Sequence, residues 1–223
     1  MIDYKKLFKQ LLSELNEVTD LEVITSEIGK GTAAAEFTDI ENSFRMKLTK
    51  DIYEFYSQVG FVNIEWRFKK PLQLDEQEYV VDGKINILPL HDVFWGVDDL
   101  GWGNILWFDH MENATKQKMR KLRPFDFFDE EDNGCISFQR NETDVSPNLV
   151  LYSTDNGYYP LKLNIESYLK LLLQTKGISR WPFLLVKAPI NENEIFMATM
   201  KTFLPLLFKN NKEYDLFMKN MNL

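Results

Sequence analysis

The spacing of apolar residues changes twice along this chain, and this change limits the possible folds more than any other feature. From Tyr4 to Val18 apolar residues recur at steps of three and four, which is the period of an amphipathic helix. Over residues 61–68 apolar and polar residues alternate, which is the period of a half-buried strand. Three more short strands and a returning helix are predicted at 134–138, 148–153, 158–163 and 165–176.

Turn residues stand directly between several of these predicted strands. Asp155-Asn156-Gly157 separates the last two, and Asp82-Gly83 separates residues 79–81 from residues 85–88. Tight turns of this kind join antiparallel neighbours, whereas parallel strands need a long crossover. We therefore expect an α+β fold, with a largely antiparallel sheet of about five to six strands flanked by helices in a single domain.

The part of the chain after Gly177 is predicted to be helical. Gly177 stands where a glycine commonly ends a helix, here the helix over 165–176. Pro205 is expected to end or kink a later helix, and a last short helix is predicted over 212–221. We expect residues 1–177 to form the α+β domain and residues 178–223 to form a C-terminal helical extension packed on it.

The net charge bears on the kind of partner. The chain has 34 acidic and 26 basic residues and a formal net charge of −8. Nucleic-acid affinity depends on basic groups that neutralise phosphates, so we expect no nucleic-acid partner. The charge favours a basic protein partner, although solubility alone would also explain it. The basic run Lys116–Arg123 has no stacking aromatic residue and is followed at once by acidic residues.

Cysteine content and the N-terminal segment indicate a cytoplasmic protein. Cys135 is the one cysteine of the sequence, so an intramolecular disulfide is impossible, as fits a reducing compartment. The first 18 residues lack the uninterrupted apolar stretch of a signal peptide. No run of 18 apolar residues occurs, so we expect neither a membrane span nor a membrane partner.

Residue sets that carry catalysis or hold a metal are scarce. The sequence has two histidines and no His-Glu-x-x-His motif. Cys135 lies in a predicted strand, where a thiol is commonly a small buried apolar group. The acidic run 129–132 lacks the alternating spacing of a calcium loop. We expect no enzymatic activity, no metal and no cofactor; an unrecognised enzyme that uses Asp109, His110 and Glu112 is the alternative.

Two groups of residues are predicted to bind the partner. Tryptophan is enriched at the energetic centres of protein interfaces, and here tryptophans alternate with glycines and aspartates. Trp107, within a predicted buried strand over 105–108, is expected to be a core residue instead. An ordinary core and a solvated turn are the competing explanations. The predicted contact residues are Trp95, Asp98, Asp99 and Trp102 in the first group, and Asp129, Glu130, Glu131 and Asp132 in the second.

A series of hydrophobic landmarks runs through the middle of the chain. They are Leu48–Tyr56, Gly60-Phe61, Ile85–Leu90 with Val93-Phe94, Leu122–Asp126, and Leu161–Leu163 with Ser167–Leu169. In this order they resemble the SUKH superfamily: a helix and its turn, the strand leading into the central loop, a segment seen in bacterial members, and the closing strand with its helix. The resemblance covers roughly residues 30–177.

The resemblance to the SUKH superfamily implies a single α+β domain that binds other proteins and catalyses nothing. Bacterial members typically act in the cytoplasm and inactivate toxins by direct binding. We therefore expect an immunity protein that neutralises a secreted toxin domain, and the resemblance implies basic nucleases as one class of such toxins. The alternative, suggested by the fungal regulators of cell-wall synthesis in the same superfamily, is an intracellular regulatory or scaffold module with several partners.

Overall fold

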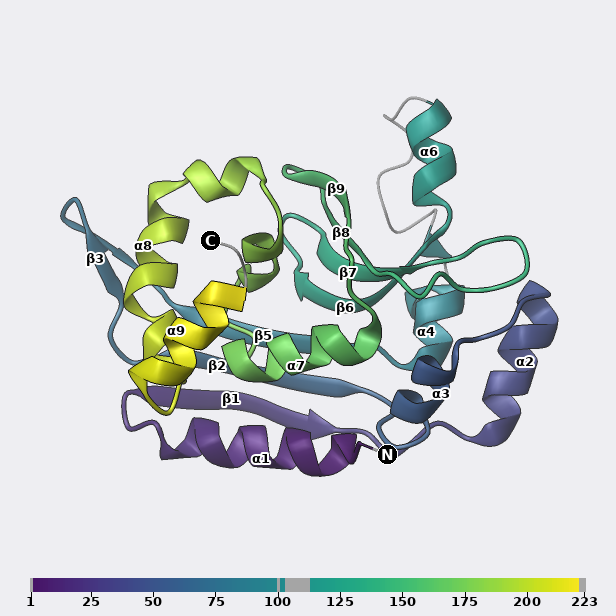
Figure 1. Cartoon of the computed structure of the whole chain (residues 1–223), viewed down its shortest axis with the longest axis horizontal. Helices are drawn as coiled ribbons and strands as arrows, with labels where there is room; N and C mark the ends of the chain where they lie inside the picture. The colour runs from purple at the N-terminus through teal and green to yellow at the C-terminus, as the bar shows by residue number, and fades with distance from the viewer. Residues whose placement is uncertain (1, 100, 103–112, 221–223) are drawn as a thin grey trace.

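A computed structural model of the chain describes residues 2–99, 101–102 and 113–220, and its described part is an α+β domain built on one large antiparallel sheet (Figure 1). The α+β class is thus confirmed, but the sheet has seven strands rather than five or six. Their order is β1 (Leu21–Ile28), β2 (Val62–Phe68), β5 (Asp82–Ile87), β6 (Leu122–Asp129), β7 (Gly134–Gln139), β8 (Val150–Ser153) and β9 (Gly157–Pro160). A separate two-stranded ribbon pairs β3 (Leu72–Leu74) with β4 (Gln77–Tyr79).

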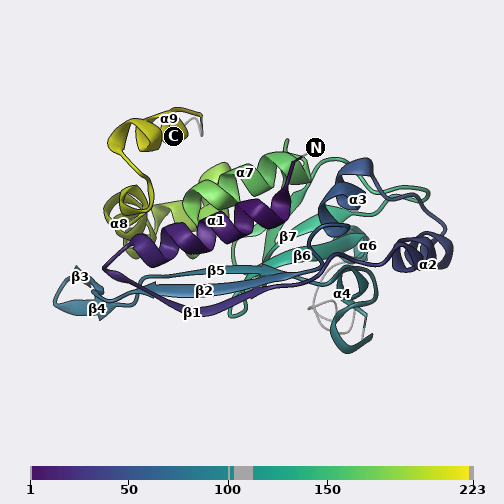
Figure 2. The ribbon, with the colours of Figure 1, turned by 90° about the horizontal axis from the view of Figure 1, so that it is seen from below.

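The helices cover the sheet unequally. Figure 2 shows α1 and α7 side by side on one face, whereas α4 lies on the other. None of the described helices is both long and apolar enough to cross a membrane. The helices are α1 (Tyr4–Glu17), α2 (Ala34–Phe44), α3 (Lys50–Tyr56), α4 (Leu90–Trp95), α6 (Asn113–Met119), α7 (Ile165–Thr175), α8 (Glu194–Thr202) and α9 (Asn211–Asn220), with short 3₁₀ turns η1 (Val97–Asp99), η3 (Trp181–Leu185), η4 (Pro189–Glu192) and η5 (Leu204–Leu207).

Capping side chains fix where the two large covering helices begin. The Asp3 carboxylate accepts a hydrogen bond from the Lys6 backbone N–H at 2.9 Å, and Asn164 does the same for Ser167 at 2.9 Å. Each bond satisfies an N–H group that has no partner inside its helix. The apolar stripes of both helices then face the sheet and are buried, as the helical spacing at both places predicts.

The predicted hairpin at Asp82-Gly83 is wrong, because both residues lie inside β5. The tight turn instead joins β3 to β4, where Asp75 and Glu76 adopt positive φ angles of 47° and 64°. Gly83 is required for packing against Trp66 and not for a turn. A Cβ atom at this position would lie 2.2 Å from Cε2 of the buried Trp66 indole. The glycine therefore allows close packing within a strand.

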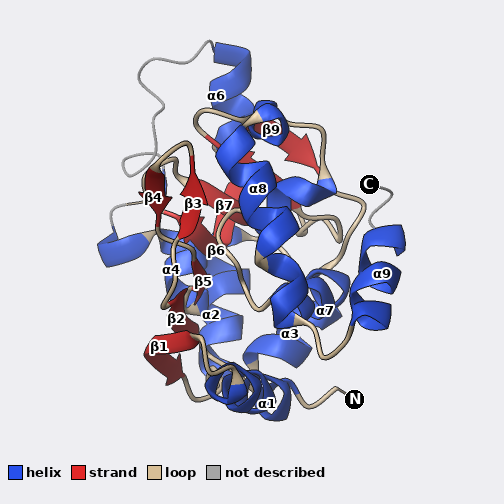
Figure 3. Cartoon of the chain, turned by 90° about the vertical axis from the view of Figure 1, so that its left-hand side faces the viewer, coloured by secondary structure: helices blue, strands red, loops and turns tan. Residues whose placement is uncertain are grey.

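The segment after Gly177 packs on the sheet and completes its core. The ring of Trp181 stacks on Tyr168 with centroids 5.4 Å apart, and the ring of Phe203 lies 4.9 Å from that of Phe68. Both extension residues are almost fully buried. Figure 3 shows α8, which belongs to this segment, standing beside the β3–β4 ribbon. The C-terminal extension therefore forms one wall of a cleft between itself and the sheet.

Candidate protein-binding cleft

A cleft of about 640 Å³ opens where the C-terminal extension meets the end of the sheet. Its walls are β1, β2, the segment from the end of β4 into β5, the β6–β7 turn, the turn at Ser179-Arg180, and α8 with Asn193 before it. The residues that carry its charge and its apolar character are Ile24, Glu65, Tyr79, Val80, Asp82, Lys84, Asp129, Glu130, Glu131, Arg180 and Ile195. We call this site the acidic cleft.

The β6–β7 turn is held in one shape by Asp129. One carboxylate oxygen of this residue accepts hydrogen bonds from the backbone N–H groups of Glu131, at 3.2 Å, and Asp132, at 3.3 Å. The other oxygen pairs with Nε of Arg180 at 2.7 Å. Because Arg180 belongs to the C-terminal extension, this ion pair fixes the turn against the opposite wall of the acidic cleft.

Carboxylates outnumber cations in the acidic cleft by five to two. Both cations are already paired: Arg180 with Asp129, and Lys84 with Glu130 at 2.6 Å and Glu65 at 3.2 Å. Burial alone would lower the pKa of Lys84, but the hydrogen bonds that it donates to these two carboxylates, and their charges, raise it above its usual value. Lys84 therefore stays charged, and the negative charge of the cleft exceeds what its own cations neutralise.

Two carboxylates have no cationic partner in the described part of the chain. Glu131 is exposed and has no ion pair there. Asp82 accepts a hydrogen bond from the hydroxyl of Ser179 but likewise has no ion pair. Glu130 is paired, yet its side chain is 67% exposed. These groups can receive Lys or Arg side chains from a partner without first losing a strong buried contact.

Apolar side chains lie exposed beside these carboxylates. Val80 is 72% exposed and Ile24 is 55% exposed, and both line the cleft. The side chains of Tyr79 and Ile195 also line the cleft and are partly exposed. Exposed apolar residues surrounded by polar ones are typical of surfaces that bind other proteins. The acidic cleft therefore combines charge for attraction with apolar area for affinity.

The second predicted group of contact residues lies partly on this cleft. Asp129, Glu130 and Glu131 line it, but Asp129 is occupied by the turn and by Arg180. Asp132 is buried and does not line the cleft. Its carboxylate accepts hydrogen bonds from the Asp155 backbone N–H at 2.7 Å and from Asn156 at 2.9 Å, so it holds the β8–β9 turn. Glu130 and Glu131 are the members that a partner can reach.

The first predicted group lies on a different part of the molecule, around the end of α4 (Figure 1). Trp102 is only 6% exposed, and its indole N–H donates to the Val93 carbonyl at 2.8 Å, so it is a core residue. Trp95 is half-buried and stacks on His91 with centroids 4.7 Å apart. Asp98 is exposed with a φ of 55°, and Asp99 ends the same turn. The two groups therefore do not form one surface.

Several sequence predictions fall outside the described residues. These are the strand over 105–108 with Trp107, and the alternative catalytic set of Asp109, His110 and Glu112. Within the described part of the chain, no three His, Cys, Asp or Glu side chains converge as metal ligands. Cys135 is fully buried, and this burial raises the pKa of its thiol to about 12. Its thiolate, the reactive form, is therefore not populated at neutral pH.

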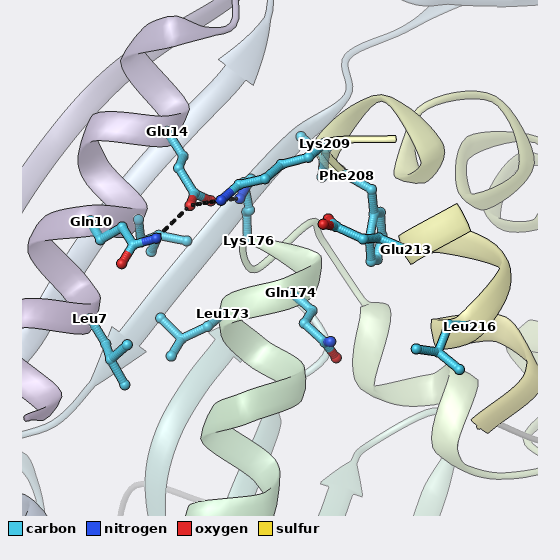
Figure 4. Close-up of a pocket in the computed structure, with 12 residues that line it drawn as sticks. Leu7, Gln10, Glu14, Leu173, Gln174, Lys176, Phe208, Lys209, Glu213 and Leu216 are labelled. Atoms are coloured by element: carbon cyan, nitrogen blue, oxygen red, sulfur yellow. Dashed lines mark hydrogen bonds and ion pairs between the residues drawn. The ribbon is translucent and has the colours of Figure 1, made fainter. Parts of the chain in front are cut away.

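A second hollow, of about 250 Å³, lies between α1, α7 and α9 (Figure 4). Glu14 lines one end of it and accepts hydrogen bonds from Lys176 and from Gln10, the latter at 3.0 Å. Lys209 approaches the same carboxylate at 3.3 Å. Both lysines of the hollow are thus paired with Glu14, so the hollow is a junction between the N-terminal helix and the extension. We do not assign it a ligand.

Most of the acidic cleft was missed by sequence reasoning. Val80 and Asp82 were assigned to a hairpin, and Ile24 and Arg180 stood in segments with no predicted contact role. The one usable signal was the acidic run that includes Glu130 and Glu131. The other residues that line the cleft come from five separate segments of the chain, and the sequence contains no local pattern that would group them.

The comparisons with known proteins add no relative. No model of a known protein family matches the sequence, and no curated protein matches it. The similarity to the SUKH superfamily therefore stays a prediction. The function has to be argued from the acidic cleft and its chemistry.

Proposed function

We propose that this protein is a non-catalytic binding protein that receives a basic region of a partner protein in the acidic cleft. The observation that carries the proposal is the set of five carboxylates beside exposed Ile24 and Val80. Together with the SUKH resemblance, this favours an immunity protein that acts in the cytoplasm and neutralises a toxin domain by direct binding. A nuclease domain suits the chemistry, because its substrate cleft is basic and carboxylates can occupy the places of phosphates.

Charge and apolar area have separate parts in this binding. The carboxylates of Glu130 and Glu131 attract a basic partner and accelerate association, and salt screens this attraction over roughly 8 Å at physiological ionic strength. Val80 and Ile24 lose water on contact, and this contribution depends little on salt. The proposal therefore predicts an association rate that falls with salt and a dissociation rate set mainly by the apolar residues.

The experiment starts by identifying the partner. Tagged protein would be used to capture partners at low and high salt, and each retained protein would then be purified and tested together with a panel of purified toxin nuclease domains. One basic toxin domain bound tightly supports the immunity function. Several partners of similar, weaker affinity would instead support the regulatory module.

Substitutions in the acidic cleft then test the site itself. We expect Glu131→Lys to weaken binding about tenfold, and Glu131→Lys combined with Val80→Asp to weaken it about a hundredfold. Calorimetric titration of the purified partner measures both. Glu142→Lys and Leu206→Asp make the same chemical changes at exposed positions away from the cleft and are the matched controls. Equal losses in the cleft variants and in the controls would refute the assignment.

A further inference from the structure

Two arginine side chains lie against one phenylalanine ring on the side of the molecule away from the acidic cleft. Arg123 belongs to β6, Arg140 follows β7, and Phe44 is the last residue of α2. The guanidinium carbons lie 5.6 Å and 5.4 Å from the centre of the Phe44 ring. Each contact is a cation–π interaction, which stabilises one positive charge but does not neutralise it.

Strand register brings the two arginines together. Arg123 pairs directly with Phe138 across the β6–β7 ladder. Arg140 follows Phe138 by two residues, and side chains two apart along an extended chain leave the same face. The arginines are therefore diagonal neighbours on one face, a separation that long side chains can bridge. The backbone register therefore places the two positively charged side chains next to each other, and their proximity does not depend on one side-chain rotamer.

The two guanidinium groups have more donors than the described residues can satisfy. Arg123 donates from Nη1 to the carbonyls of Arg120 and Leu122, and Arg140 donates from Nη2 to the carbonyl of Phe44. The Nε atoms of both arginines are buried and have no hydrogen-bond partner. Neither side chain has an ion pair in the described part of the chain, so both charges lack a counter-ion there.

Two neighbouring arginine charges, one of them buried, destabilise the folded state unless a counter-ion neutralises them. Arg123 is only 8% exposed, and burial, together with the neighbouring charge of Arg140, lowers its pKa to about 10. The arginine is still charged at neutral pH, so the fold holds a buried cation close to a second one. An anion with a double negative charge would neutralise both groups and accept hydrogen bonds from Nη2 of Arg123 and Nη1 of Arg140, which are not used by the bonds above, whereas the two Nε atoms are buried beyond its reach. A single carboxylate would neutralise only one.

We propose that Arg123 and Arg140 form an oxyanion site that takes one phosphate group, either inorganic or carried on a phosphomonoester. Phosphate carries about 1.5 to 2 negative charges at neutral pH, and its oxygens match the planar fork of a guanidinium group. The site is separate from the acidic cleft, so its test does not depend on the proposed function.

Binding of inorganic phosphate to the purified full chain is the direct test. We expect a saturable rise in Tm, of about 5 °C when phosphate reaches a hundredfold excess over its Kd, and none with sodium chloride at equal ionic strength. A tenfold tighter binding of a phosphomonoester such as ribose 5-phosphate would assign the ligand to a carrier molecule. Equal binding of both would assign it to free phosphate.

Variants decide whether these two arginines are responsible. Arg140→Met, at the more exposed position, should weaken phosphate binding at least tenfold, and Arg140→Lys should retain part of it because the charge remains without the fork. Arg67→Met removes an exposed arginine elsewhere on the sheet and should leave binding unchanged. The proposal is overturned if no phosphate compound raises Tm beyond the sodium chloride control, or if Arg140→Met binds phosphate as tightly as the wild type.

Discussion

Replacing Asp126 by asparagine should remove a fall of about 3 kcal/mol in the free energy of unfolding that the wild type undergoes between pH 4 and pH 7. Asp126 lies on β6 and is completely buried. Burial raises the pKa of its carboxyl to about 6, although hydrogen bonds from the Tyr168 hydroxyl and the Asn86 backbone N–H, and the charge of Lys84, act in the opposite direction. At pH 7 the fold therefore holds an ionised carboxylate that the unfolded chain would expose to water at lower cost.

The effect has a defined pH window. The pKa of Asp126 is raised from 3.8 to about 6 in the folded state, so the folded protein keeps this proton where the unfolded chain has lost it. The protonated group contributes stability below pH 4, and that stability is lost as the pH rises to about 6. Asparagine has no proton to lose, so Asp126→Asn should show no such fall.

Urea unfolding of both proteins between pH 3.5 and 7.5 checks this prediction. The difference between the two proteins is the quantity to follow, because the other carboxylates titrate alike in both and cancel. We expect the difference to be smallest below pH 4 and largest above pH 6. A difference that stays constant over the whole range would show that the Asp126 carboxyl does not titrate differently in the folded and unfolded states.

The second large effect is a loss of stability of about 3 kcal/mol in Gly83→Ala. The added Cβ atom would lie 2.2 Å from Cε2 and 2.3 Å from Cζ2 of Trp66. The indole is fully buried, and its N–H donates to the Lys176 carbonyl at 2.7 Å. It therefore cannot move aside without breaking a buried hydrogen bond between β2 and the end of α7.

A double-mutant cycle separates this clash from a general intolerance of alanine at position 83. Trp66→Phe removes the indole atoms that the new Cβ would meet, at the cost of the hydrogen bond to Lys176. We expect Gly83→Ala to destabilise the Trp66→Phe background much less than the wild type, as measured by urea unfolding. Additive losses would mean that backbone conformation at Gly83, and not Trp66, makes glycine necessary.

The elements that could be predicted from the sequence are those with one buried face. In β2 the residues Val62, Ile64 and Trp66 are buried while those between them are not, so the alternation survives in the sequence. In α1 and α7 a helical apolar stripe faces the sheet. These patterns follow directly from geometry, and they were enough to give the α+β class.

The strands that were missed break that pattern for physical reasons. In β6 almost every residue from Leu122 to Phe128 is buried, and the run includes Arg123, Pro124 and Asp126, so no alternation is visible. In β1 a register shift between Val23 and Thr25 moves later residues to the other face. Asp82-Gly83 has the composition of a turn, but the glycine there makes room for Trp66.

The residues of the acidic cleft could likewise be predicted only in part, because they come from segments that are far apart in the sequence. Glu130 and Glu131 could be grouped from the sequence because they adjoin each other in one acidic run. Ile24, Val80 and Arg180 meet them only after six segments of the chain have packed together. Likewise, Trp102 has the composition of an interface residue, but its burial against Val93 depends on how the α4 region folds back on itself.

The junction at Glu14 has a consequence for the time at which this protein can finish folding. Glu14 on the first helix is bonded to Lys176 and approached by Lys209, and the rings of Trp181 and Phe203 seal the core beneath. A nascent chain on the ribosome can pair its early strands in order, because neighbours in the sheet largely follow one another in sequence. It cannot close this core until Phe203 and the residues around it have left the exit tunnel. Until then Phe68 on β2 and Tyr168 on α7 lack these ring contacts, so the time needed to synthesise the extension determines how long that apolar surface is open to chaperones and to aggregation.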